Sequence, residues 1–240
     1  MRRSGPKSST SGSLIRAIRR SLGAAADPAK APLMQAYMKS SMPYLGVPTP
    51  RFRQAVRPLL AVHPFDSFEA WRDTILGLWR EARYREERYA AIELAGWRRY
   101  GQFRTLEALP MYEEMIVSGA WWDYIDSIAP RQLGEILRKH AVPFGSILRQ
   151  WAACDNQWKR RSAILAQLHF KHQTDLNLLY DCIRPSLGAR EFFLRKSIGW
   201  ALRQYARSDP QEIVRYVRRH EEKLSPLSKR EALRHIQSTA

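Results

Sequence analysis

Apolar residues recur at helical spacing in almost every segment of the chain, and this pattern constrains the fold more than any other feature. Leu14, Ile18 and Leu22 form one such stripe, and the segments 87–100 and 163–170 repeat the pattern. Alternation of apolar and polar residues, which is typical of strands, is nearly absent, and no Asn-Gly or Asp-Gly hairpin signal occurs. We therefore expect an all-α fold.

Helix start signals divide the chain into many short helices. Asp209 before a proline predicts one helix start, and so does the pair Thr49-Pro50. Further expected caps are Asp66, Asp155 and Thr174, together with a capping box from Ser228 to Glu231. Prolines, among them Pro130, mark the gaps between helices. The signals predict roughly a dozen helices of about 10–18 residues, joined by short connections.

Helices joined by short loops pack as antiparallel pairs, and a series of such pairs forms a solenoid. No strict sequence repeat is visible, so the repeats would be degenerate, as in HEAT-like arrays. A compact irregular bundle is the alternative. We favour the solenoid, with one domain over residues 12–240. Basic residues are spread along the whole chain, and they need a long concave face to act together. Residues 1–11 are basic and Ser-rich and are expected to form a flexible tail.

Charge indicates the kind of partner. The chain has 40 Lys and Arg against 23 Asp and Glu, a net charge of +17. Such an excess favours a polyanion, with nucleic acid ahead of a membrane surface. Any single arginine could simply lie on a solvated helix face. Clusters of basic residues recur in most helical segments between Arg51 and Arg219, and they include Arg85, Arg104 and Arg161. Arginine suits phosphate because its planar fork can donate two hydrogen bonds at once.

Several function classes are disfavoured by composition. No stretch approaches the roughly 20 apolar residues of a membrane span. The only cysteines, Cys154 and Cys182, are too few for a Cys-rich zinc site or an iron–sulfur cluster. A reduced pair is typical of cytoplasmic proteins, and no signal peptide is visible. We expect no metal and no cofactor.

The segment GAWWDYIDSIAP, residues 119–130, is the first candidate site. Taken as a helix, it places Trp121, Ile125 and Ile128 on a core stripe. Trp122 and Asp126 are also four residues apart, but on an adjoining face. This spacing alone leaves two alternatives open, a packed core with a stray acid and a functional site.

The segment 191–207 is the second candidate site. Phe193, Ser197 and Trp200 share one stripe, and Arg203 follows one turn later. Gly199 lies in mid-helix, where it costs about 1 kcal/mol relative to alanine. A glycine there either allows another backbone to approach closely or leaves room beside Trp200.

Five blocks in order along the chain resemble the AlkD-type DNA alkylation repair enzymes. They are YMKSSMPYLGVPTPRFR, WWDYIDSIAP, DNQWKRRSAILAQLHFK, EFFLRKSIGWALRQYAR and LSPLSKREALRHI. The resemblance runs from about residue 13 to the C-terminus. It implies a C-shaped solenoid of HEAT-like repeats with duplex DNA in a basic concave groove. It also implies a DNA glycosylase that removes cationic N3- and N7-alkylated purines.

The resemblance also implies site residues. Asp126 matches the catalytic acid, and Trp122 and Trp200 match two tryptophans of the cleft. Arg161 matches a DNA-backbone contact and Tyr37 a residue near the DNA. Further DNA-binding candidates in the matched blocks are Phe193, Arg203 and Lys171. His169 departs from the expected pattern, since a lysine would be expected there.

The chemistry that the resemblance implies is hydrolysis without metal or amine nucleophile. An alkylated purine leaves as a neutral base, so positive charge develops on the sugar and an acid such as Asp126 can stabilise it. The resemblance further implies that the base can stay stacked rather than being flipped. We expect a monomer that works on duplex DNA in the cytoplasm, at the nucleoid. The alternatives are a non-catalytic helical-repeat module that binds nucleic acid, and a protein-binding scaffold with a neutral or apolar concave face.

Overall fold

The computed structural model of the chain describes residues 9–234 and residue 236. Within these residues the chain forms 14 α-helices and no strand, which confirms the predicted all-helical fold. Several helices are shorter than expected, down to six residues in α8 (Gly134–Lys139). Most of the predicted basic tail, residues 1–8, lies outside the described residues, and α1 (Ser9–Ala24) begins directly after it.

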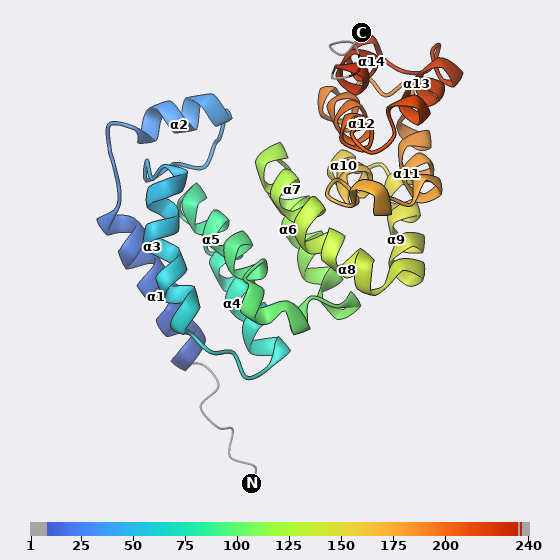
Figure 1. Cartoon of the computed structure of the whole chain (residues 1–240). Coiled ribbons are helices and arrows are strands. Elements are labelled where there is room, and N and C mark those ends of the chain that lie inside the picture. The colour runs from blue at the N-terminus through green and yellow to red at the C-terminus, as the bar shows by residue number, and fades with distance from the viewer. Residues whose placement is uncertain (1–8, 235, 237–240) are drawn as a thin grey trace. The chain divides into compact units, whose positions relative to one another are not determined.

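The chain divides into two compact units, Met1–Phe103 and Arg104–Ala240. We describe each unit by itself (Figure 1). The single domain over residues 12–240 and the curved basic groove stay predictions. None of the described helices is long and apolar enough to span a membrane.

The first unit is a bundle built around α1. The other helices are α2 (Ala31–Met38), α3 (Thr49–Val62), α4 (Phe68–Arg80), α5 (Arg85–Ala95) and the short η1 (Arg98–Phe103). Helix α1 packs against α3, α4 and α5, and α4 packs along α5. The predicted stripe of Leu14, Ile18 and Leu22 is buried at this centre, which confirms it as part of the core.

A buried acid holds the connection between α2 and α3. The fully buried carboxylate of Glu86 accepts hydrogen bonds from three successive backbone N–H groups, those of Leu45, Gly46 and Val47, each at 3.0 Å. Gly46 has a φ of +80°, and a Cβ there would lie 2.1 Å from the carbonyl oxygen of Asp27. The loop thus depends on a glycine for its path and on Glu86 for its backbone hydrogen bonds.

The second unit holds the remaining helices. They are η2 (Leu106–Ala108), α6 (Leu109–Gly119), α7 (Trp122–Ile128), η3 (Ala129–Leu133), α8, α9 (Ala141–Ala153), α10 (Gln157–Leu165), η4 (Lys171–Gln173), α11 (Leu176–Ile183), η5 (Arg184–Ser186), α12 (Phe192–Tyr205), α13 (Pro210–Arg219) and α14 (Pro226–Leu233). Helix α10 is central and packs against α6, α7, α9 and α12. Helices α12, α13 and α14 form the C-terminal end of the unit (Figure 1).

Helix starts follow the predicted chemistry, but several positions differ. Asp209 accepts a hydrogen bond from the backbone N–H of Glu212 at 2.9 Å, which confirms this cap. The other observed side-chain caps are Ser67, Asn156, Asp175 and Ser225. The first three lie one residue after the predicted caps, and Ser225 replaces the predicted capping box at Ser228. Thr49 is the first residue of α3 and provides no cap.

The expected gap at Pro130 is wrong, because the helix continues through it. Helix α7 runs into the π-helical turn η3 and then into α8. A proline has no N–H, so the carbonyl of Asp126, four residues earlier, has no α-helical donor at this point. Widened turns of this kind are frequent at functional sites. The widened turn therefore begins within one turn of the candidate acid.

Candidate functional site

Trp122, not Trp121, begins α7. Trp121 is the residue before the helix and has extended backbone angles, φ −149° and ψ 145°. The predicted core stripe is therefore wrong for Trp121, although Ile125 and Ile128 are fully buried as expected. The half-buried Trp121 ring instead packs against Trp158 and Phe193, with ring centroids 6.1 and 5.5 Å away.

Asp126 is held by Arg161, which comes from α10. The Nε and Nη2 atoms of Arg161 donate to the two carboxylate oxygens of Asp126 at 2.8 and 2.9 Å. The Asp126 side chain is 18% exposed and the Arg161 side chain 4%. The ion pair is therefore bidentate. The Arg161 guanidinium is buried, whereas part of the Asp126 side chain is exposed.

The same arginine also reaches α12. Its Nη1 donates to the backbone carbonyl of Phe193, and its guanidinium lies 5.9 Å from the Phe193 ring centre. Phe193 packs in turn on Trp158, with ring centroids 5.2 Å apart. Arg161 thus joins three helices, α7, α10 and α12, at one point. Its predicted contact with the DNA backbone stays a prediction.

Burial controls the charge of the acid. It raises the pKa of Asp126 from 3.8 to about 6, against the opposing attraction of Arg161. Burial also lowers the pKa of Arg161, while Asp126 opposes this shift. A carboxylate with this pKa is mostly ionised at neutral pH and gains a proton only in mild acid. Asp126 can therefore act as an anion or as a base near pH 7.

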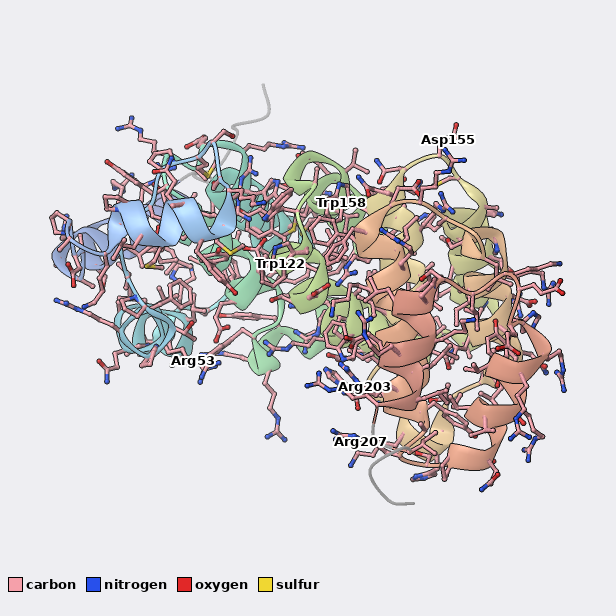
Figure 2. All side chains as sticks on the ribbon, turned by 90° about the horizontal axis from the view of Figure 1, so that it is seen from above. Arg53, Trp122, Asp155, Trp158, Arg203 and Arg207 are labelled. Carbon is pink, nitrogen blue, oxygen red and sulfur yellow. The ribbon has the colours of Figure 1, made fainter. Side chains whose placement is uncertain are left out.

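Both candidate tryptophans are half-buried. Trp122, which Figure 2 labels, begins α7. Its spacing of four residues from Asp126 places both residues on the same face of that helix. Trp200 lies on α12, seven residues after Phe193 and on the same stripe. Arg161 bonds the Phe193 carbonyl, so the Phe193 end of this stripe lies beside the ion pair of Asp126 and Arg161.

Arg203 has an acid partner of its own. Its Nη1 donates to a carboxylate oxygen of Glu231 in α14, and the Lys196 Nζ donates to the other oxygen at 3.0 Å. Figure 2 labels Arg203 and, on α10, Trp158, which stand apart in that view. Arg203 follows Phe193 by ten residues on α12, so it lies about 15 Å further along the helix axis.

The family follows from comparison with known proteins. The model of the DNA alkylation repair enzyme family matches residues 18–236. This chain belongs to that family. A solved structure described as a predicted DNA alkylation repair enzyme from Enterococcus faecalis is similar to this member, with 30% identity and a TM-score of 0.75. The similarity covers 87% of this chain and 95% of that one. No curated protein matched significantly.

Membership confirms the family resemblance read from the five sequence blocks. It indicates DNA repair, with DNA as the substrate, and supports an enzymatic role. The all-helical structure is consistent with the helical-repeat fold of this family.

Three other residues singled out in the sequence lie outside α7, α10 and α12. Tyr37 is on α2 in the first unit and is 78% exposed. Lys171 is exposed in η4 and has a φ of +54°. His169 is exposed, and its carbonyl accepts a hydrogen bond from Arg138 at 3.1 Å. Their contacts with DNA stay predictions.

Three arginines from the predicted basic set are buried in this family member. Arg85, Arg104 and Arg161 are only 4–5% exposed. Arg104 pairs with Glu135 at 2.6 Å. Buried guanidinium groups add little to an exposed basic surface, so that surface is smaller than the arginine count suggests.

Proposed function

We propose that this family member is a monofunctional DNA glycosylase that hydrolyses the N-glycosidic bond of cationic N3- and N7-alkylated purines in duplex DNA. One observation carries the proposal: Asp126 is a partly exposed acid with a raised pKa, paired with a buried arginine, in a chain of net charge +17. An acid on a surface that binds DNA repels phosphate. Such an acid is useful only where positive charge develops.

Charge development in this reaction fits an acid. The alkylated base leaves as a neutral molecule, and the sugar becomes an oxocarbenium-like cation in the transition state. A fixed carboxylate stabilises that cation and can accept a proton from an attacking water. In this proposal the indoles of Trp122 and Trp200 exclude water from the sugar, which strengthens the attraction between Asp126 and the sugar.

Each tryptophan has a proposed role in the same step. Trp122 and Trp200 flank the sugar, and their negative π-faces favour a cationic ring. Trp122 is half-buried on the face of α7 that carries Asp126, as this role requires. Arg161 fixes both carboxylate oxygens and so keeps Asp126 oriented before DNA binds. The proposed scheme uses no metal and acts on one duplex as a monomer.

The experiment measures release of N7-methylguanine from alkylated duplex DNA under single-turnover conditions. We expect wild type to release the base and Asp126→Asn to be slower by about 10²–10³-fold, as for loss of one electrostatic stabiliser. Asp123→Asn is the matched control, since it is the same change three residues earlier, in the first turn of α7. It should stay within a few-fold of wild type. Equal rates for wild type and Asp126→Asn would contradict the role of Asp126.

The alternative is a helical-repeat module that binds nucleic acid without chemistry. The exposed arginines of both units would serve it equally well. Absence of base release by wild type, with tight and salt-dependent duplex binding, would favour this module over the glycosylase.

A further inference from the structure

Helix α12 carries three candidate residues, Phe193, Trp200 and Arg203, and α14 lies directly against it. Gly199 permits this contact. A Cβ at Gly199 would lie 2.5 Å from the Cβ of Glu231 and 3.0 Å from the carbonyl oxygen of Ser228. A side chain at this position would therefore push the two helices apart.

Glu231 fastens α14 to this face of α12. Its carboxylate bonds Lys196 and Arg203, which with Gly199 lie at i, i+3 and i+7 on one face. Glu231 is 9% exposed. Ser228 adds a hydrogen bond from its hydroxyl to the carbonyl of Arg195 at 2.9 Å.

The charge of Glu231 is maintained by its two cations. Burial raises the pKa of Glu231, but the hydrogen bonds and charges of Lys196 and Arg203 outweigh burial and hold it below its ordinary value. Glu231 is therefore ionised at neutral pH, and its two bonds to α12 are charge-assisted.

Trp200 lies between two fixed points of α12. At one end, Arg161 holds the carbonyl of Phe193, seven residues before Trp200 and about 10 Å away along the helix axis. At the other, Glu231 holds Arg203, three residues after Trp200. The position of Trp200 is therefore determined jointly by the arginine that orients Asp126 and by an acid of α14.

We propose that Glu231 is a positioning residue for base release: by holding Lys196 and Arg203 it fixes the position of α12, and with it the position of Trp200 relative to Asp126. This inference rests on the proposed glycosylase function. Glu231 touches neither DNA nor the reacting atoms in this scheme. Displacing a positioned group by about 1 Å can reduce a rate by about 10²-fold, so an acid that acts only through α12 can still have a large effect.

The test compares Glu231→Gln with a matched control, Glu212→Gln. Glu212 of α13 also holds an arginine, Arg215, and a second donor, the Tyr180 hydroxyl. Its side chain is 17% exposed, against 11% for Glu231. The two changes therefore remove similar buried acids from neighbouring helices. Single-turnover release of N7-methylguanine gives the rate, and titration of a fluorescently labelled undamaged duplex gives the affinity.

We expect Glu231→Gln to reduce the maximal single-turnover rate by about 10-fold or more, with duplex affinity unchanged or tighter, because two cations lose their acid. A purely structural role would reduce the rate and the affinity together, through a smaller folded fraction. Glu212→Gln should retain the wild-type rate. Glu231→Asp keeps the charge and should recover part of the rate.

A double-mutant cycle tests the route through Trp200. Trp200→Phe and Glu231→Gln should be non-additive, because the second change displaces a side chain that the first has already altered. A wild-type rate in folded Glu231→Gln, an equal loss in Glu212→Gln, or full additivity with Trp200→Phe would each overturn the proposal. These outcomes differ from failure of the glycosylase proposal, in which wild type itself releases no base and both proposals fall.

Discussion

The rate of base release should depend on pH through Asp126. Its pKa of about 6 leaves about one carboxylate in eleven ionised at pH 5 and nearly all ionised at pH 7.5. If the ionised form is the active one, kcat/KM should fall about tenfold between these two pH values. The measurement is release of N7-methylguanine at limiting enzyme, from substrate DNA whose spontaneous loss is subtracted at each pH.

The control is Asp126→Asn, whose residual rate should not vary with pH in this window. A wild-type rate that stays level from pH 7.5 to pH 5 would refute the argument, since it would mean that Asp126 either titrates elsewhere or takes no part. A fall of the same size in Asp126→Asn would assign the titration to another group.

The same titration should appear in stability without any activity. Asp126 has a folded pKa of about 6, above its ordinary 3.8, so the folded state binds more protons between these values. Its contribution therefore stabilises the protein as pH falls from 7 to 5, by about 1 kcal/mol. His63, His169 and His220 have lowered pKa values, mainly through burial, and act in the opposite direction below pH 6.5.

The difference between wild type and Asp126→Asn removes these histidine contributions. Urea unfolding at pH 7 and pH 5 should show the free energy of unfolding of wild type gaining about 1 kcal/mol relative to the variant. Equal changes in both proteins, with equal m-values, would show that burial does not raise the pKa of Asp126.

Three further predictions concern the fold and the DNA. Glu86→Gln should lower the free energy of unfolding, measured in urea, by about 1–3 kcal/mol, because the amide N–H would face the backbone donors that Glu86 now accepts from. An unchanged value would contradict the role of Glu86 in holding the loop. Gly134→Ala should cost about 1–3 kcal/mol, since its Cβ would lie 2.8 Å from the Ala166 carbonyl oxygen, whereas Gly23→Ala has open space and should stabilise α1 by up to about 1 kcal/mol. Duplex binding should weaken with salt, with a log–log slope of about −0.9 per phosphate contacted, and a flat titration would exclude the basic surface.

Sequence was sufficient for the fold class but not for helix starts. Where two residues that can cap a helix stand side by side, as in Asp66-Ser67 or Asp155-Asn156, both satisfy the local rule. The structure selects the second in each case, because only there does the backbone turn from extended to helical. The local rule does not distinguish the two residues, so the choice depends on the rest of the fold.

The candidate site was predictable only where its residues are close together in the sequence. Trp122 and Asp126 are one turn apart, so helical spacing alone places them on one face. The pair between Asp126 and Arg161 joins residues 35 apart in the sequence, and no local pattern specifies it. The resemblance assigns Arg161 to a DNA-backbone contact, which stays a prediction, and no sequence pattern indicates that its side chain is 4% exposed and paired with Asp126. Gly199 left two alternatives open, and the structure supports the close approach of α14.

Among the carboxylates of the second unit that pair with buried or half-buried arginines, Glu135, Glu231 and Asp126 differ in the number of cations that bind them. Glu135 is bonded by Arg104 and Lys139, and Glu231 by Lys196 and Arg203; in both, two cations outweigh burial and lower the pKa. Asp126 is bonded by one cation among the described residues, and burial raises its pKa instead. Two cations thus offset the burial of Glu135 and of Glu231, whereas among the described residues no second cation pairs with Asp126. A sugar that becomes cationic in the transition state would supply the missing charge, and only for the duration of the reaction.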